Sequence, residues 1–147
     1  MRQYAAVLDA HQGEMAELIH REEGKPLGEA QAEVARACEV VHHFAAEAER
    51  LWTMQLPGAS ISTGSIVRPA PIGVVAAITP WNFPVALVLW KLGPALAAGC
   101  CMIVKPAEEA PLAARRLCDL ATEAGLPDGV VSCITGDGPL IGEALCT

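Results

Sequence analysis

The sequence has no cluster of lysine and arginine residues. Its 10 basic residues are spread along a chain of 147 residues that also carries 17 acidic ones, which gives a formal net charge of −7. Proteins that bind DNA or RNA neutralise the phosphates with a concentrated basic surface. The sequence therefore predicts no nucleic-acid partner and favours a small molecule.

Signals for secretion, membrane insertion and metal binding are also missing. The N-terminus carries no secretion signal, and the six cysteines form no C-x-x-C pair or other closely spaced zinc-ligand pattern. We therefore expect a cytoplasmic setting and no metal site. The only apolar stretch of near membrane-spanning length, 85–104, is interrupted by Lys91, Gly93 and Pro94, so no membrane span is expected.

Aromatic residues are scarce at 4%, but 52% of the chain is hydrophobic, which is enough for one α/β domain with a core. The centre of the sequence predicts a βαβ unit. Its first strand is a β-branched run without polar alternation, which indicates burial on both faces, and two prolines stiffen the loop that follows. Strand, loop, helix, strand and loop are expected at 72–78, 79–84, 85–98, 100–104 and 105–111.

Two polar side chains directly follow the strands of this unit. Asn82 lies in the first loop, and Lys105 ends the second strand. Crossovers between parallel strands are nearly always right-handed, and ligands of open α/β sheets bind outside the carboxyl ends of the strands. The two loops are therefore predicted to face one crevice.

Residues 1–56 predict two amphipathic helices. The first shows apolar spacing of three and four residues and ends at Gly24 and Pro26, and because no capping residue precedes it, we expect a further segment upstream. The second has one apolar face, and its charged face predicts a solvated or domain-bridging surface. The apolar faces are Tyr4, Leu8, His11, Met15 and Leu18, then Val34, Ala37, Val41, Phe44, Ala48 and Leu51; the charged face is Glu29, Glu33, Arg36, Glu47 and Arg50.

A strand and a turn are predicted next, at 57–70. Pro57 and Gly58 are a turn signal, and the alternation of polar and apolar residues from Ser60 to Arg68 is typical of a half-exposed edge or hairpin strand. Such a strand can pair with another subunit, although its serines and threonines also oppose edge pairing. Both interpretations stay open at this point.

After the central unit, a helix at 112–124, a strand at 130–134 and a short last helix, opened by residues 136–139 and running to Cys146, are expected. The predicted fold is α/β: a partial doubly wound, Rossmann-like parallel sheet preceded by two amphipathic helices and an edge or hairpin strand. Segments 1–56 and 57–70 then precede the first part of a nucleotide-binding domain at 71–147. The glycines at 136, 138 and 142 miss the dinucleotide fingerprint by one residue, so they decide nothing alone.

Several motifs resemble the aldehyde dehydrogenase superfamily, and together they cover almost the whole chain. Proline, tryptophan and asparagine in fixed order after a buried strand, with a lysine ending the next strand, are more specific than any glycine pattern. Flavodoxin-like and other nucleotide-binding folds are the alternatives. The matching stretches are 23–30, 71–75, 78–84, 91–99, 105–108 and 124–130.

The resemblance implies roles for the first loop. Asn82 would donate its side-chain amide to the aldehyde oxygen as that oxygen becomes negative. Ile78, Thr79, Pro80 and Trp81 would form part of the wall along the cofactor. The alternative for Asn82 is a turn residue, because asparagine is common in loops. The alternative for Trp81 is an aromatic residue of the core.

The second loop would bind the adenosine half of the cofactor. Lys105 would hydrogen-bond the ribose hydroxyls and Glu108 the 2′-hydroxyl, and because a carboxylate repels a 2′-phosphate, NAD is expected in preference to NADP. Gly138 and Pro139 would pass beneath the adenine, and Gly142 would let the last helix approach closely. A surface ion pair and an ordinary strand-to-helix turn are the alternatives.

The chemistry implied by the resemblance needs a cysteine thiolate, a hydride acceptor and a glutamate base. The family's nucleophile and base lie beyond the point that corresponds to Thr147, and none of the six cysteines is expected to act. We expect an internal piece of an NAD-dependent enzyme that oxidises a semialdehyde or aromatic aldehyde, inactive alone and homo-oligomeric at full length. The alternative is a truncated, non-catalytic relative that binds nucleotide or associates through 60–68.

Overall fold

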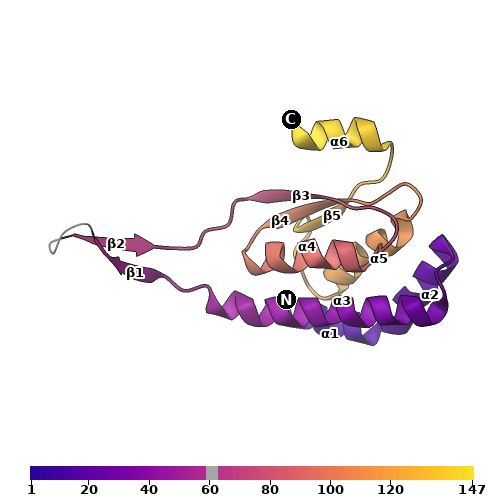
Figure 1. Ribbon diagram of the computed structural model, residues 1–147, viewed down its shortest axis with the longest axis horizontal. Coiled ribbons are helices and arrows are strands. Elements are labelled where there is room, and N and C mark those ends of the chain that lie inside the picture. Colours follow the sequence, from indigo (N-terminus) through magenta and orange to yellow (C-terminus); the bar gives the residue numbers. More distant parts are fainter. Residues whose placement is uncertain (59–62) are drawn as a thin grey trace.

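The computed structural model of the chain describes residues 1–58 and 63–147. Three helices come first, a β-hairpin follows, and strands and helices then alternate (Figure 1). The elements are α1 (Arg2–Ala10), α2 (Gln12–Glu23), α3 (Leu27–Glu47), η1 (Ala48–Arg50), β1 (Met54–Pro57), β2 (Gly64–Val67), β3 (Val74–Ile78), α4 (Ala86–Ala97), β4 (Cys101–Lys105), α5 (Pro111–Glu123), β5 (Val131–Cys133) and α6 (Gly138–Cys146).

The first helix predicted from the sequence is two helices, so the expectation of one continuous helix was wrong. The chain leaves helical geometry at His11, whose backbone has φ −110° and ψ 12°. The His11 imidazole is 2.7 Å from the carbonyl oxygen of Val7, an interaction that competes with the helical bond of the backbone. The expected apolar face is nevertheless buried on both sides of the break, and Gly24 ends α2 in the left-handed conformation.

The parallel sheet has the order β3-β4-β5, with Val74 opposite Cys101 and Ile78 opposite Lys105. This confirms the predicted half of a doubly wound sheet. The expectation that the first strand is buried on both faces was wrong, because Val74 and Ile78 are half-exposed or more while Ala77 is buried. Helices α4 and α5 cover one face, and α6 lies on the side opposite α4 (Figure 1). An all-apolar strand does not show from its periodicity which face is covered.

The hairpin extends away from the body of the molecule (Figure 1). Strand β2 pairs antiparallel with β1, from Met54 opposite Val67 to Pro57 opposite Gly64, which agrees with the expected hairpin strand. Strand β1 was not expected from the sequence, because residues up to 56 predict a helical segment. All described hairpin residues are exposed apart from Gly58. The part of the predicted strand at 60–62 lies outside the described residues.

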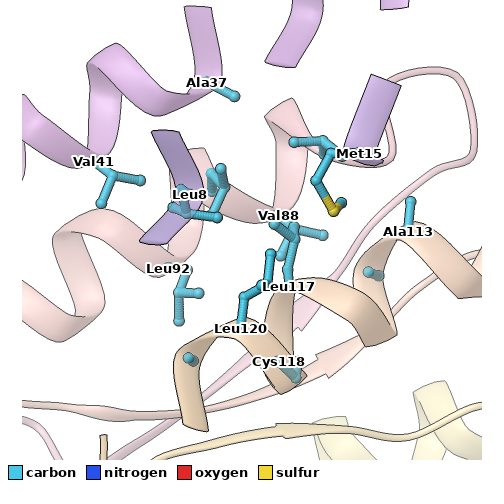
Figure 2. Close-up of a cluster of buried hydrophobic side chains, with 14 of the residues drawn as sticks. Leu8, Met15, Ala37, Val41, Val88, Leu92, Ala113, Leu117, Cys118 and Leu120 are labelled. Carbon is cyan, nitrogen blue, oxygen red and sulfur yellow. The ribbon is translucent and has the colours of Figure 1, made fainter. Parts of the chain in front are cut away.

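One apolar core joins all five helices that precede the last strand (Figure 2). Its centre contains Leu8 of α1, Met15 of α2, Val41 of α3, Leu92 of α4 and Leu117 of α5, each almost completely buried. The buried hydroxyl of Tyr4 donates to the carbonyl oxygen of Leu117 at 3.0 Å, which ties the N-terminal helix to α5. The N-terminal helices therefore pack as part of the same body as the sheet. Among the described residues, no helix is long and apolar enough to cross a membrane.

Candidate functional site

The carboxyl ends of β3, β4 and β5 lie at one edge of the sheet, because all three strands are parallel. The loops after them are tied together at their first residues. Thr79 donates its backbone N–H to the carbonyl oxygen of Lys105 at 3.1 Å, and Ile134 does the same to Val104 at 2.9 Å. The predicted proximity of the two polar loops is therefore present, with the start of α6 as a third neighbour.

Three of the predicted cofactor residues form one cluster. The side chain of Lys105 is buried, and its ammonium lies 4.0 Å from a carboxylate oxygen of Glu108. That same oxygen accepts a hydrogen bond from the backbone N–H of Gly138 at 2.6 Å. A Cβ added at Gly138 would lie 3.2 Å from Glu108 Oε1 and 3.8 Å from Lys105 Nζ. Glycine at 138 therefore lets the start of α6 lie against both charged groups.

A cleft of about 310 Å³ borders this cluster. The first turn of α6 begins there, with the Asp137 carboxylate accepting from the N–H of Leu140 at 2.9 Å. The cleft thus has a carboxylate acceptor at its wall, next to a buried ammonium donor, which is a suitable pair for adjacent hydroxyl groups. Its lining is Pro106, Ala107, Glu108, Pro111, Thr135, Gly136 and Asp137.

The remaining predicted cofactor residues differ in exposure. Trp81 is 54% exposed, so the alternative of a core tryptophan is excluded, and Ile78 is 48% exposed. Thr79 is buried, and its hydroxyl has no partner among the described residues. Pro80 and Pro139 are exposed. Exposed apolar groups at the carboxyl edge of a sheet are available to pack against a flat ligand.

The predicted close approach at Gly142 is not seen in the described part of the chain, where no atom lies within 4 Å of a Cβ built there. Asn82 is exposed and does not line the cleft beside Glu108. Its carbonyl oxygen accepts from the ammonium of Lys25 at 2.8 Å. The structure therefore brings Lys105, Glu108 and Gly138 into contact and holds Asn82 separately in the neighbouring loop.

Lys25 also contacts two carboxylates. The surroundings of the Asn82 loop therefore contain charged groups that the sequence motifs do not predict. The ammonium of Lys25 lies 2.5 Å from Glu33 and 2.8 Å from Glu23, and 4.3 Å from the centre of the Phe83 ring. Burial opposes the charge, but the attraction of the two carboxylates, one of which accepts a hydrogen bond from the ammonium, outweighs it and raises the pKa of Lys25 above its ordinary value.

The expectation that Glu33 lies on a solvated face was wrong. Its side chain is buried, and one carboxylate oxygen accepts from the backbone N–H groups of Val85 and Ala86, both at 3.0 Å. The first N–H groups of a helix have no intrahelical partners, and a carboxylate suits the positive end of the helix dipole. A signal was present in the sequence, because Glu33 lies three residues after Ala30 and four before Ala37, on the buried face of α3.

An apolar groove of about 360 Å³ lies between α3 and α4 and begins at Phe83, the residue after Asn82. Phe83 and Trp90 are each 47% exposed along it. The groove could accept the organic part of a ligand whose polar end reaches the Asn82 loop. Its lining is Glu29, Ala32, Glu33, Arg36, Phe83, Ala86, Leu87 and Trp90.

The described cysteines are mostly packed in the body of the protein. Cys38, Cys100 and Cys118 are buried, and Cys101 lies half-buried in β4. Burial, aided by the charge of Asp9, raises the pKa of the Cys38 thiol to about 11. A thiol in this state is protonated at neutral pH and is a poor nucleophile.

The sequence of the whole chain was compared with known families, and the model of the aldehyde dehydrogenase family matches residues 1–147. The chain belongs to this family. A glutarate-semialdehyde dehydrogenase of Pseudomonas putida is 45% identical over 145 residues, which are 99% of this chain and 30% of the relative. The NADP(+)-dependent succinate-semialdehyde dehydrogenase of Escherichia coli is 43% identical over the same length and with the same coverage.

Solved aldehyde dehydrogenase structures share the fold. A betaine aldehyde dehydrogenase from Staphylococcus aureus in complex with NAD+ is 34% identical, with a TM-score of 0.93 over 98% of this chain and 29% of that one. An NADP-dependent enzyme from E. coli is 44% identical, with a TM-score of 0.92 over 96% and 29%. The chain thus spans about 30% of the length of the relatives that it matches. Its relatives include users of both cofactors, so membership of the family leaves the choice between them open.

Proposed function

We propose that this chain is part of an NAD-dependent aldehyde dehydrogenase that oxidises an aldehyde to a carboxylate through a cysteine thioester. The observation that supports this most is the pair of neighbouring loops at one edge of the sheet, one with Asn82 and the other with the cluster of Lys105, Glu108 and Gly138. The thiolate and the glutamate base would come from the rest of the protein. The chain by itself would then be inactive.

Asn82 would act on the substrate oxygen. Its side-chain amide has no hydrogen-bond partner among the described residues, while its carbonyl oxygen is held by Lys25. An amide that is free and fixed at its backbone can donate to the oxygen as negative charge develops during thiolate attack. One such donor lowers the barrier by about 3 kcal/mol in other enzymes.

The Lys105 cluster would bind the ribose next to the adenine. A buried ammonium, a carboxylate and a glycine where a Cβ would crowd that carboxylate are a suitable arrangement for a ribose with two free hydroxyls. Glu108 would accept from the 2′-hydroxyl and repel a 2′-phosphate, which supports NAD in preference to NADP. When bound, the nicotinamide cofactor supplies the hydride acceptor, while Ile78 and Trp81 would pack along it.

The substrate would place its organic part in the groove between α3 and α4. Phe83 and Trp90 favour an aromatic aldehyde, whereas Arg36 could pair with the carboxylate of a semialdehyde. Glu29 and Glu33 line the same groove, and their negative charges oppose the carboxylate of a semialdehyde there. An aromatic aldehyde is therefore the substrate class that we favour, and turnover of benzaldehyde against succinic semialdehyde tests it. A higher kcat/KM for the semialdehyde would contradict this choice.

The test of the main proposal uses the full-length protein that contains this chain. We expect it to reduce NAD in the presence of an aldehyde, and Asn82→Ala to lower kcat about 100-fold, the effect of removing one oxyanion donor. Gln31→Ala, which removes an exposed amide on α3, is the matched control and should leave kcat unchanged. Activity equal to wild type in Asn82→Ala would overturn the role of Asn82, and absence of NAD or NADP reduction with any aldehyde would overturn the enzyme proposal.

The second candidate function is a non-catalytic module that binds another subunit. The observation that favours it is the projecting hairpin, on which Met54, Leu56, Ile66 and Val67 are all more than 40% exposed. Exposed apolar residues on a two-stranded edge are suitable for pairing with a second subunit. A full-length protein that is monomeric in sedimentation analysis would contradict pairing through the hairpin.

A further inference from the structure

Lys25 links the end of α2 and the buried face of α3 to the loop after β3, which lies 57 residues away in the sequence. Its ammonium lies within 2.8 Å of Glu23 at the end of α2, of Glu33 in α3, and of the carbonyl oxygen of Asn82 in the loop after β3. The side chains of Lys25, Glu23 and Glu33 are 12%, 7% and 1% exposed. Burying a lysine normally lowers the stability of the folded protein, because the ammonium loses its contacts with water. The partners of Lys25 compensate for this loss.

Glu33 extends the same network to the first turn of α4. One of its oxygens pairs with Lys25, and the other accepts from the backbone N–H groups of Val85 and Ala86. The loop from Thr79 to Val85 is therefore held at two points, at Asn82 by the ammonium and at the helix start by the carboxylate. The position of Lys25 over the Phe83 ring adds a third contact.

These contacts hold the backbone at Asn82 and in the residues that follow it, while the side-chain amide of Asn82 has no hydrogen-bond partner among the described residues. A shift of about 1 Å in a group that binds the transition state can cost on the order of 100-fold in rate. The direct partner of the Asn82 backbone is the lysine, and the lysine is in turn oriented by Glu33. The network thus has the arrangement of a support for a polar group that must be in place before the substrate binds.

We propose that Lys25 and Glu33 are positioning residues for the oxyanion donor Asn82. This inference rests on the proposed function, because it takes Asn82 as the donor. Neither residue touches the reacting atoms: Lys25 fixes the Asn82 carbonyl, and Glu33 fixes Lys25 and the start of α4. Loss of either contact should lower kcat more than it changes the binding of cofactor.

The variants are made in the full-length enzyme. Lys25→Met removes the ammonium and keeps the length of the side chain. Glu33→Gln keeps an oxygen for the N–H groups of Val85 and Ala86 but turns an NH₂ toward Lys25, so it breaks the ion pair and spares the helix cap. Lys25→Arg keeps the charge and hydrogen-bond donors. Lys91→Met is the matched control, because among the described residues the Lys91 ammonium bonds only to Leu87 in its own helix.

The expected result is a fall in kcat of at least tenfold for Lys25→Met and Glu33→Gln, with the KM for NAD within twofold of wild type. Lys25→Arg should recover most of kcat, and Lys91→Met should not change it. In an Asn82→Ala background, Lys25→Met should lower kcat less than threefold further, because its effect acts through Asn82. Amide hydrogen exchange at 81–83 and at Val85 and Ala86 should be faster in Lys25→Met.

Two results would overturn the proposal while leaving the proposed function intact. One is a kcat within twofold of wild type for Glu33→Gln and Lys25→Met. The other is an equal fold-loss for Lys25 substitution with and without Asn82, which indicates general destabilisation. If Lys25→Met does not fold, Glu33→Gln replaces it in the same cycle. A wild-type enzyme without aldehyde oxidation would overturn both proposals together.

Discussion

Two glutamates in this protein make the same kind of contact in opposite surroundings. Glu33 and Glu108 each accept from backbone N–H groups at the start of a helix that follows a strand, Glu33 at α4 and Glu108 at α6. Glu33 is 1% exposed at its side chain and in contact with Lys25, whereas Glu108 is 54% exposed and 4.0 Å from Lys105.

This difference in exposure indicates that the contact of Glu33 is structural, whereas a ligand can reach the carboxylate of Glu108. Every oxygen of Glu33 is occupied by protein donors, so its carboxylate belongs to the packing of α3 against α4. The exposed carboxylate of Glu108 can exchange its contact with the helix for one with a ligand hydroxyl, since water already competes for it. A third glutamate, Glu22, accepts from Leu112 and Ala113 at the start of α5 and is intermediate in exposure.

The largest expected effect is the loss of stability from Glu33→Ala. It leaves two helix N–H groups and the Lys25 ammonium without their main partner in a buried site, and breaking a buried ion pair costs about 3–5 kcal/mol. Chemical denaturation of the full-length protein measures the change. Glu39→Ala, an exposed carboxylate on the same helix, should shift the midpoint little. If Glu39→Ala shifted the midpoint as much as Glu33→Ala, the buried contacts of Glu33 would not be the cause of its effect on stability.

Glu108→Gln should change cofactor choice rather than stability. Removing the negative charge relieves repulsion of a 2′-phosphate, so the KM for NADP should fall on the order of tenfold while unfolding changes by less than about 1 kcal/mol. Steady-state kinetics with both cofactors measures this in the full-length enzyme. An unchanged ratio of kcat/KM for NAD and NADP would show that Glu108 does not face the ribose.

Glu22→Ala tests the intermediate case. The substitution leaves the first N–H groups of α5 to water, and loss of a helix cap costs about 1 kcal/mol. Thermal denaturation should place this variant between Glu33→Ala and Glu108→Gln. A loss as large as that of Glu33→Ala would mean that burial does not decide the strength of these contacts.

The order of strands and helices in the sheet could be predicted from the sequence because each element is a local pattern. Apolar runs, prolines and glycines mark the bounds of β3, α4, β4 and α5 to within one or two residues of those observed, and the proximity of the loops that follow β3 and β4 follows from the parallel order alone. The network around Lys25 could not be predicted in this way. Glu23 is two residues from Lys25, but Glu33 and Asn82 lie 8 and 57 residues away, and no local pattern pairs them with the lysine.

The same limit explains the errors at Glu33 and His11 in the N-terminal half and the error in β3. Glu33 was assigned to the charged face of α3 because its neighbours in that stripe are solvated, although α4 covers it. The chain breaks at His11, but the same apolar face continues from α1 into α2. The spacing of apolar residues therefore does not show the break. The exposed face of β3 carries apolar residues, so composition alone predicts burial there.

The smallest expected effect is at an exposed ion pair, which sharpens the contrast with the buried one. Arg116 pairs with Glu14 at 2.6 Å, and this hydrogen bond lowers the pKa of Glu14. A depressed carboxyl pKa adds stability above the pKa of the unfolded state, and this stability is lost as the pH falls through the folded value. Arg116→Gln should therefore cost about 0.5 kcal/mol at pH 7 and nothing in strong acid, while Arg115→Gln, its exposed neighbour, is the control. If the cost persists in strong acid or in 1 M salt, it comes from packing of the arginine rather than from its charge.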